Sequence, residues 1–146
     1  MSTQFYQGYN ENTLQGNEFT VDNGTVTYDA ANNKASISDA TLPTTLECTG
    51  LADADGELDL QLFTNLTRID SINNKITMLY IDGADKLNYL DFSGNYLTNT
   101  DDVFNCLNPD VPNGFISISG GNNTPLTSEC SENMSKLVMA GWWWYR

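Results

Sequence analysis

Residues 66–76 read LTRIDSINNKI, and residues 87–97, which lie 21 positions later, read LNYLDFSGNYL. The two segments place large apolar residues at the same positions, with one serine as the exception, and asparagine at a shared position. Residues 58–60 (LDL) and 79–81 (LYI) are related by the same shift. Self-similarity at a fixed period of about 20 to 50 residues is the signature of stacked repeats, so this pattern decides the architecture.

The physical reason for such a period is burial. One coil of this length makes a short strand, a turn and a returning segment, and its apolar side chains become buried only when coils stack. The asparagine at the turn can bond backbone groups that the curved chain leaves unpaired. The predicted asparagine ladder consists of Asn74 and Asn95. The predicted repeat core consists of Leu58, Leu60, Leu66, Ile69, Ile76, Leu79, Ile81, Leu87, Leu90, Phe92 and Leu97. The alternative is a meander of unrelated strands with coincident spacing.

A fainter copy precedes these two. The triplet Leu46-Glu47-Cys48 resembles Ile69-Asp70-Ser71 after a gap of 23 residues. Because terminal repeats are usually atypical, residues 42–56 are interpreted as a divergent first coil.

Beyond the second clear copy, the pattern changes to that of a cap. Residues 100–107 predict a short helix, residues 115–119 alternate as a strand, and the glycines and asparagines of 120–123 predict a turn. Residues 128–140 have the spacing of a helix, and residues 142–146 predict a closing strand.

The first 41 residues follow a different pattern. Residues 19–28 form two alternating runs around Asn23-Gly24, the strongest short signal for a β-hairpin. Before them the chain is polar and rich in Gln and Asn, with Phe5, Tyr6 and Tyr9 as its aromatic residues. Such a segment has too few aliphatic residues for its own core, so it is either loose or packs on another surface.

Composition excludes several kinds of site. The chain has 146 residues, a formal net charge of −13 and no histidine. Lack of histidine removes Ser-His-Asp and Cys-His chemistry and every histidine-ligated metal site. A surface of this charge repels phosphate backbones and anionic lipid, so no nucleic-acid or membrane partner is predicted. The widely spread Cys48, Cys106 and Cys130 predict buried free thiols.

The chain shows no sign of targeting to a membrane. Its first seven residues lack a basic n-region and an apolar h-region, so we predict no secretory signal. No apolar run approaches the roughly 20 residues of a spanning helix.

The spacing of residues 66–76 and 87–97 resembles that of leucine-rich repeats, and the downstream segment resembles the cap of short bacterial-type members of that family. The cap resemblance lies in Ser117-x-Ser119-Gly120-Gly121-Asn122-Asn123 followed by Lys136-Leu137-Val138-x-x-Gly141-Trp142. The likeness covers about residues 58–144. The chain departs from the family in its very short repeat array and in three consecutive tryptophans where a single one is usual.

Together with the hairpin signal of residues 19–28, this resemblance predicts an α+β fold that is mostly β: a short leucine-rich-repeat solenoid with a C-terminal helix and strand cap and an N-terminal β-hairpin arm. Residues 1–41 would form a docking module and residues 42–146 the capped repeat domain. The resemblance also implies a non-enzymatic structural or recognition protein, because such units occur in bacteriophage structural proteins and in bacterial surface proteins.

From the resemblance and the predicted absence of a signal, we expect a bacteriophage virion accessory protein, assembled in the host cytoplasm. It would decorate the capsid, form a short head fibre or attach to the tail. Its expected partners are capsid or tail proteins and further copies of itself, with a host-surface receptor or glycan as a further candidate. The alternative is a bacterial cell-surface or secreted adhesion module.

The last strand suggests a contact site. A strand alternates faces, so if Trp142 and Trp144 complete the core, Trp143 and Tyr145 point outward. The predicted partner-binding residues are therefore Phe5, Tyr6, Tyr9, Trp143 and Tyr145. The competing interpretation is that a neighbouring loop or the N-terminal arm covers these side chains.

Acidic residues recur on or near the repeat strands. Asp59, Asp70, Asp82 and Asp91 could form a docking stripe for a basic partner or weak Ca²⁺ sites, or could serve solubility alone. Residues 53–59 hint at a calcium loop but lack the EF-hand spacing, which favours a plain turn. No catalytic, cofactor-binding or metal-binding residue is predicted.

Overall fold

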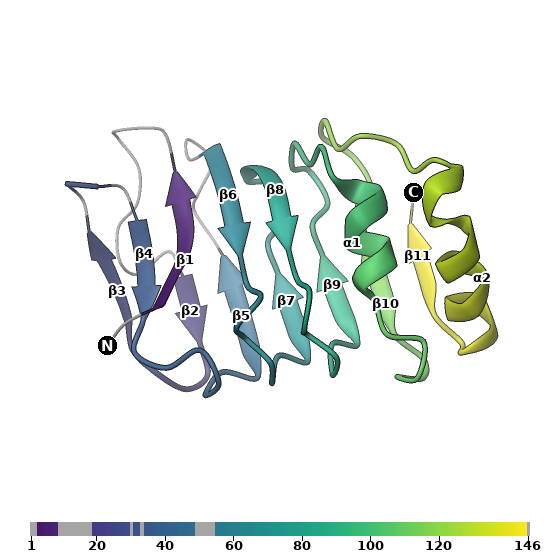
Figure 1. The fold of residues 1–146 in the computed structure, drawn as a ribbon. Helices are drawn as coiled ribbons and strands as arrows, with labels where there is room; N and C mark the ends of the chain where they lie inside the picture. Colours follow the sequence, from purple (N-terminus) through teal and green to yellow (C-terminus); the bar gives the residue numbers. More distant parts are fainter. Residues whose placement is uncertain (1–2, 9–18, 30, 33, 49–54, 146) are drawn as a thin grey trace.

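Two sheets face each other across an apolar core in the computed structural model, which describes residues 3–8, 19–29, 31–32, 34–48 and 55–145 (Figure 1). The six-stranded sheet has the order β11 (Trp143–Tyr145), β10 (Phe115–Ser117), β9 (Tyr89–Asp91), β7 (Arg68–Asp70), β5 (Thr45–Cys48) and β2 (Phe19–Val21). The five-stranded sheet has the order β3 (Val26–Asp29), β4 (Lys34–Ile37), β1 (Thr3–Gly8), β6 (Asp55–Asp59) and β8 (Lys75–Tyr80).

Two α-helices lie at the C-terminal end, where α1 (Thr100–Cys106) is in front of β10 and α2 (Ser131–Met139) is beside β11 (Figure 1). The 3₁₀ turn η1 (Ser128–Cys130) leads into α2. The fold is thus mixed, with strands predominating, as predicted in outline. Within the described ranges, no helix has the length and apolar character needed to cross a membrane.

Equivalent positions of successive copies lie side by side. β6 and β8 pair in parallel with Leu58 opposite Leu79, and β7 and β9 pair in parallel with Ile69 opposite Leu90. The faint first copy aligns in the same way, because β5 pairs with β7 and places Leu46 opposite Ile69. Every residue of the predicted repeat core is buried, with an exposed fraction of 1% or less. These parallel registers contradict a meander of unrelated strands.

The helices and strands predicted for the C-terminal end are present. β10 pairs in parallel with β9, and β11 pairs in parallel with β10, so that Leu90, Ile116 and Trp144 follow one another across the sheet. The turn after β10 passes very close to the preceding coil. A Cβ atom on Gly121 would lie 2.5 Å from the Gly94 carbonyl carbon, and Gly121 also has φ +61°. Glycine is therefore required there by both space and conformation.

The N-terminal segment differs from its prediction. The expected hairpin over residues 19–28 is wrong: β2 pairs with β5 in one sheet, whereas β3 pairs with β4 in the other. The Asn23-Gly24 turn, with Gly24 at φ +98°, instead carries the chain between the sheets. The hairpin that does form joins β3 to β4.

The boundary predicted between residues 41 and 42 coincides with no break in either sheet. β1 lies between β4 and β6 and is antiparallel to both, so it is a central strand and not an arm. The ring of Phe5 is fully buried, with edge-to-face contacts to Phe19 at 5.0 Å and Phe63 at 5.5 Å between ring centroids. Phe5 is thus a core residue, and its predicted role in partner contact is wrong.

Asparagine amides bond each turn to the preceding coil. The Nδ2 of Asn95 donates to the carbonyl oxygens of Ser71 (2.6 Å) and Phe92 (3.0 Å), and its Oδ1 accepts from the Ile76 N–H (3.3 Å). The Nδ2 of Asn74 donates to the Cys48 carbonyl oxygen at 3.3 Å. Asn74 and Asn95 thus make hydrogen bonds of the kind expected from the predicted ladder, and a third asparagine makes them too. The Asn123 amide donates to the carbonyls of Phe92 and Ile118 at 2.9 and 3.1 Å.

A fourth amide closes the five-stranded sheet. The chain after β9 lies along β8, where the N–H of Tyr96 donates to the Ile76 carbonyl and the N–H of Thr98 to the Thr77 carbonyl. Next, the buried side chain of Asn99 donates to the Leu79 carbonyl (2.8 Å) and accepts from the Leu79 N–H (3.2 Å). Asn99 therefore stands in for a strand residue immediately before α1 begins.

Replacing Asn95 by alanine should lower the free energy of unfolding by about 2–3 kcal/mol, because buried backbone groups of two coils lose their partners. Asn88→Ala is the matched control, since Asn88 is exposed and no side-chain hydrogen bond is described for it. Urea denaturation followed by circular dichroism measures both. Equal losses in the two variants would contradict the structural role of the ladder.

Two aspartates fasten neighbouring segments through threonines. Asp22 accepts hydrogen bonds from the N–H groups of Thr44 (2.8 Å) and Thr45 (3.1 Å) and from the Thr44 hydroxyl. Asp101 accepts from the N–H (2.9 Å) and the hydroxyl of Thr127, the N-cap residue of η1. The threonine hydroxyl is the main cause of a lowered pKa at each aspartate.

Acidification should therefore destabilise the fold. Because the native pKa values of Asp22 and Asp101 are lowered, their contribution to stability is present above the ordinary aspartate pKa of about 4 and is lost as pH falls through the native values. The double variant D22N/D101N should lose less stability than the wild type between about pH 5 and pH 2.5. The control D85N/D110N changes exposed turn residues whose side chains have no described hydrogen bond, and it should behave like the wild type. Identical pH profiles for both double variants would refute the assignment.

Candidate functional site

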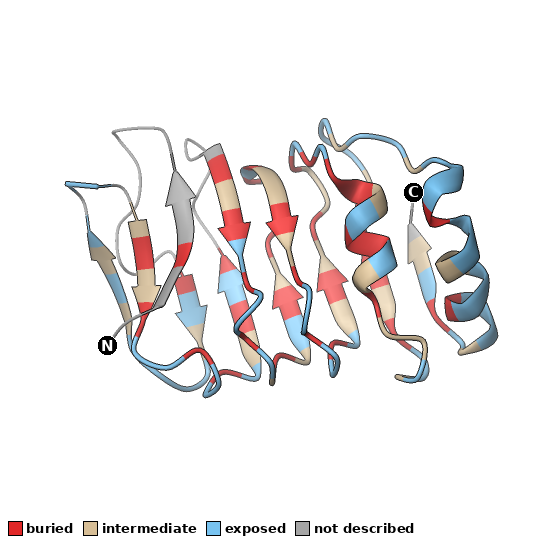
Figure 2. Cartoon of the chain, in the orientation of Figure 1, coloured by how far each residue is buried: buried red, intermediate tan, exposed pale blue. Residues whose placement is uncertain are grey.

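The outer face of the six-stranded sheet carries side chains that the core does not use. Each of β5, β7, β9 and β10 has a buried aliphatic residue that belongs to the core, namely Leu46, Ile69, Leu90 and Ile116. Figure 2 colours the buried parts of these strands red. The residues on either side of each buried aliphatic residue therefore point outward, because a strand alternates faces. The parallel registers place these outward residues in two rows that cross the strands.

One row is aromatic and ends at the edge strand. It consists of Arg68, Tyr89, Phe115 and Trp143, and we call it the aromatic row. The guanidinium carbon of Arg68 lies 3.8 Å from the ring centroid of Tyr89. The ring centroids of Tyr89 and Phe115 are 5.1 Å apart, and those of Phe115 and Trp143 are 4.3 Å apart. Trp143 is 54% exposed, so the row ends in an accessible indole.

The other row is acidic. Glu47, Asp70 and Asp91 occupy corresponding positions on β5, β7 and β9, and we call them the acidic row. Asp70 accepts a hydrogen bond from the Nε of Arg68 at 2.8 Å, and the two form an ion pair. Glu47 and Asp91 have no ion pair within the described ranges. Two of the three carboxylates thus lack a cation from the described residues.

The two rows influence each other electrostatically. The hydrogen bond to Asp70 is the main cause of a raised pKa for Arg68, so its guanidinium remains charged. Burial is the main cause of a raised pKa for Tyr89, and the Asp70 charge adds to it. The phenol therefore stays neutral, and its ring offers an uncharged face to the Arg68 cation.

A hollow of about 240 Å³ opens beside the acidic row. Its described lining consists of Glu47, Cys48, Asp70 and Ile72, which provide two carboxylates and an apolar wall. Ile72 is 46% exposed. This combination suits a side chain with an apolar stem and a cationic end.

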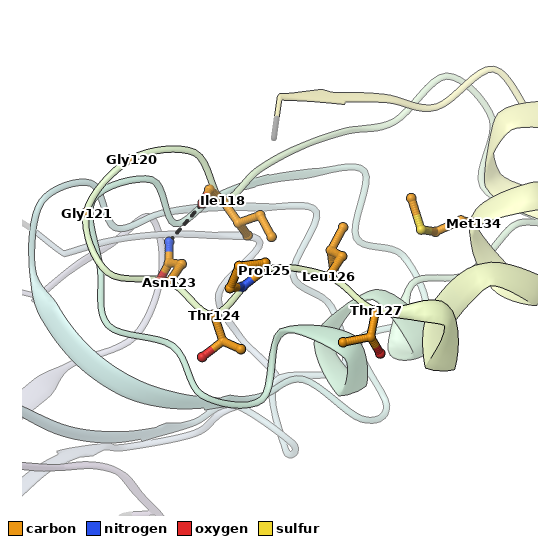
Figure 3. A pocket seen from close by; sticks show the side chains of 9 residues that line it. All are labelled: Ile118, Gly120, Gly121, Asn123, Thr124, Pro125, Leu126, Thr127 and Met134. Carbon is orange, nitrogen blue, oxygen red and sulfur yellow. Dashed lines mark hydrogen bonds between the residues drawn. The ribbon is translucent and has the colours of Figure 1, made fainter.

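A larger cavity of about 560 Å³ lies at the C-terminal end of the body (Figure 3). Pro125 and Leu126 line it from the loop after β10, and Met134 faces them from α2. The described lining carries hydroxyl, amide and apolar groups, with no titratable side chain among them. It can receive an apolar group but offers no side chain for acid–base chemistry.

The structure describes the side chains of only some of the predicted contact residues. Trp143 points outward and Trp144 packs inward, edge to face with Phe104 at a centroid distance of 5.7 Å, so the predicted alternation of these two is confirmed. Tyr6 and Tyr145 lie in β1 and β11, but their side chains are outside the described part, and Tyr9 is outside the described residues altogether.

Four surface residues of this site are not predicted by any pattern noted in the sequence: Arg68, Tyr89, Phe115 and Glu47. The 21-residue shift does carry Arg68 onto Tyr89, so applying it to the residues between the core positions could have found that pair. Phe115 follows Tyr89 after a longer interval, so the same shift does not reach it.

The predicted acidic stripe divides between two places. Asp70 and Asp91 belong to the acidic row, whereas Asp59 lies at the end of β6 and Asp82 in the turn after β8. The start of the suspected calcium loop lies outside the described residues. Among the residues that are described, no three acidic or cysteine side chains are grouped to hold a metal.

The cysteines are free thiols. Burial is the main cause of raised pKa values, to about 12 for Cys106 and about 11 for Cys130, and burial also raises the pKa of Cys48. Thiols in this state supply little thiolate and are poor nucleophiles. They belong to the packing of the fold.

Comparison of the chain with family models, curated proteins and solved structures gave no significant match.

Proposed function

We propose that this chain is a short leucine-rich-repeat solenoid that acts as a non-enzymatic binding module. The repeat assignment is supported by the 21-residue period, the in-register parallel strands and the asparagine amides that bond each turn to the coil before it.

The observation that carries the binding function is the outer face of the six-stranded sheet. A stacked parallel sheet holds its outward side chains on rigid backbone, and here those side chains form an aromatic row that ends in an exposed tryptophan. Aromatic residues on a rigid, accessible surface are typical anchors of protein interfaces.

The proposed setting is a bacteriophage particle. The cap resemblance supports it, and the protein would decorate the capsid, form part of a head fibre or attach to the tail in several copies. A bacterial surface adhesion module is the second candidate. The observation that favours it is the exposed indole of Trp143, on which a sugar ring can stack.

The setting is tested by finding the protein in its native context. Mass spectrometry of particles purified after expression from the native genome should detect the chain in many copies per particle, and a cryo-EM map should place it. A chain found only in the cell envelope fraction would favour the adhesion module and count against the virion assignment.

The binding face is tested by Trp143→Ala. The variant should keep its thermal stability within a few degrees because Trp143 is half exposed, but it should bind purified particles about tenfold more weakly. Met139→Ala is the matched control, since it removes a 90% exposed apolar side chain from α2, which is not part of the six-stranded sheet. Particle binding measured by sedimentation with labelled protein should be unchanged in the control. Unchanged binding by Trp143→Ala would exclude this face as the contact site.

A further inference from the structure

We propose that the outer face of the six-stranded sheet recognises an extended, lysine- and arginine-rich segment of a partner protein. This inference rests on the proposed function and names the chemistry of the partner. It requires that the face binds cations, that its cation sites are accessible, and that other occupants fit less well.

The protein itself displays the binding chemistry. Arg68 lies over the Tyr89 ring at 3.8 Å and pairs with Asp70 at 2.8 Å, so one cation is held by a ring and a carboxylate together. Both contacts favour a positive charge. Arg68 is the single cation among the described residues of the two rows, and it neutralises one of three carboxylates.

The combination of a carboxylate and an aromatic ring recurs on the next strand, where no described residue supplies a cation. Asp91 lies on β9 beside Tyr89, as Asp70 lies on β7 beside Arg68, and Phe115 follows on β10. The described hydrogen bonds of Asp91 engage its Oδ1 with the N–H and hydroxyl of Ser93. Asp91 and the neighbouring aromatic rings therefore offer a cation the same two contacts that Arg68 makes, one with a carboxylate and one with a ring.

The hollow between β5 and β7 supplies a second position. Glu47 and Asp70 line it with carboxylates, and Ile72 and Cys48 line it with apolar surface. A lysine can lay its methylene stem along Ile72 and place its ammonium group between the carboxylates. Neighbouring strands are about 4.8 Å apart and an extended chain advances about 3.3 Å per residue, so a segment that crosses the strands meets a new carboxylate every one or two residues.

Charge distinguishes this occupant from the others. A second copy of the chain would bring another net charge of −13 to an acidic face, which opposes association. A neutral sugar could use the exposed indole but would leave Glu47 and Asp91 without a counter-charge. A basic segment satisfies both rows and is also attracted from a distance by the net charge.

The probe is octalysine added to the full chain, with amide chemical shifts and calorimetry as readouts. We expect saturable binding that weakens as salt rises and shift changes concentrated in β5, β7 and β9. The double variant E47Q/D91N should weaken binding about tenfold. The control D102N/E132Q removes the same charge from exposed positions on α1 and α2 and should weaken it less than about twofold.

A third variant changes binding in the opposite direction. Arg68→Gln removes the internal competitor for Asp70, so octalysine should bind about threefold more tightly, although the variant loses a cation–π contact. The control is Lys136→Gln, which removes one positive charge from α2. If octalysine were attracted only by the net charge of the protein, Arg68→Gln and Lys136→Gln would increase its affinity equally.

Four outcomes would overturn the inference: equal losses in E47Q/D91N and its control, shifts confined to the helices, tighter binding of maltohexaose than of octalysine, or self-association through this face. The proposed function fails separately. It is contradicted if Trp143→Ala leaves particle binding unchanged, whether or not octalysine binds. If Trp143→Ala abolishes particle binding but octalysine does not bind the wild type, the binding face is retained and the basic partner is rejected.

Discussion

Asparagine amides that reach back to the preceding coil hold the structure in register. A parallel pair of strands can slip by one residue at little cost to its own hydrogen bonds, but such a slip would turn the inner side chains outward. Asn95 opposes it by bonding backbone groups of both coils at once, and Asn74 and Asn123 act at the neighbouring turns. The apolar core and the rows on the outer face depend on this alignment.

The sequence predicted the repeat core well because each inner position has the same neighbours in every coil. A fixed shift of 21 residues therefore identifies both the strands and their pairing. The N-terminal strands obey no such period. β1 pairs with β4 and β6, which are far away in the chain, so local patterns could not place it. The Asn23-Gly24 signal correctly marked a turn, but tertiary pairing sent its two flanking strands to different sheets.

The candidate site was predictable only in part, for a related reason. Alternation along one strand was enough to turn Trp143 outward and Trp144 inward. The aromatic row, however, exists only after stacking, since Arg68, Tyr89 and Phe115 come from three strands. Phe5 shows the reverse error: an aromatic residue in a polar segment suggested a surface anchor, whereas its ring packs against Phe19 and Phe63 in the core.

Asn99 has a consequence for how the array ends. An open sheet edge offers unpaired backbone groups to other chains, and proteins commonly protect such edges from aggregation. By bonding both backbone groups of Leu79, the Asn99 side chain completes the last rung of the five-stranded sheet and lets a helix begin where another strand would otherwise join. This amide leaves the Leu79 backbone groups unavailable to a strand from another chain, which discourages edge-to-edge aggregation at that end of the five-stranded sheet.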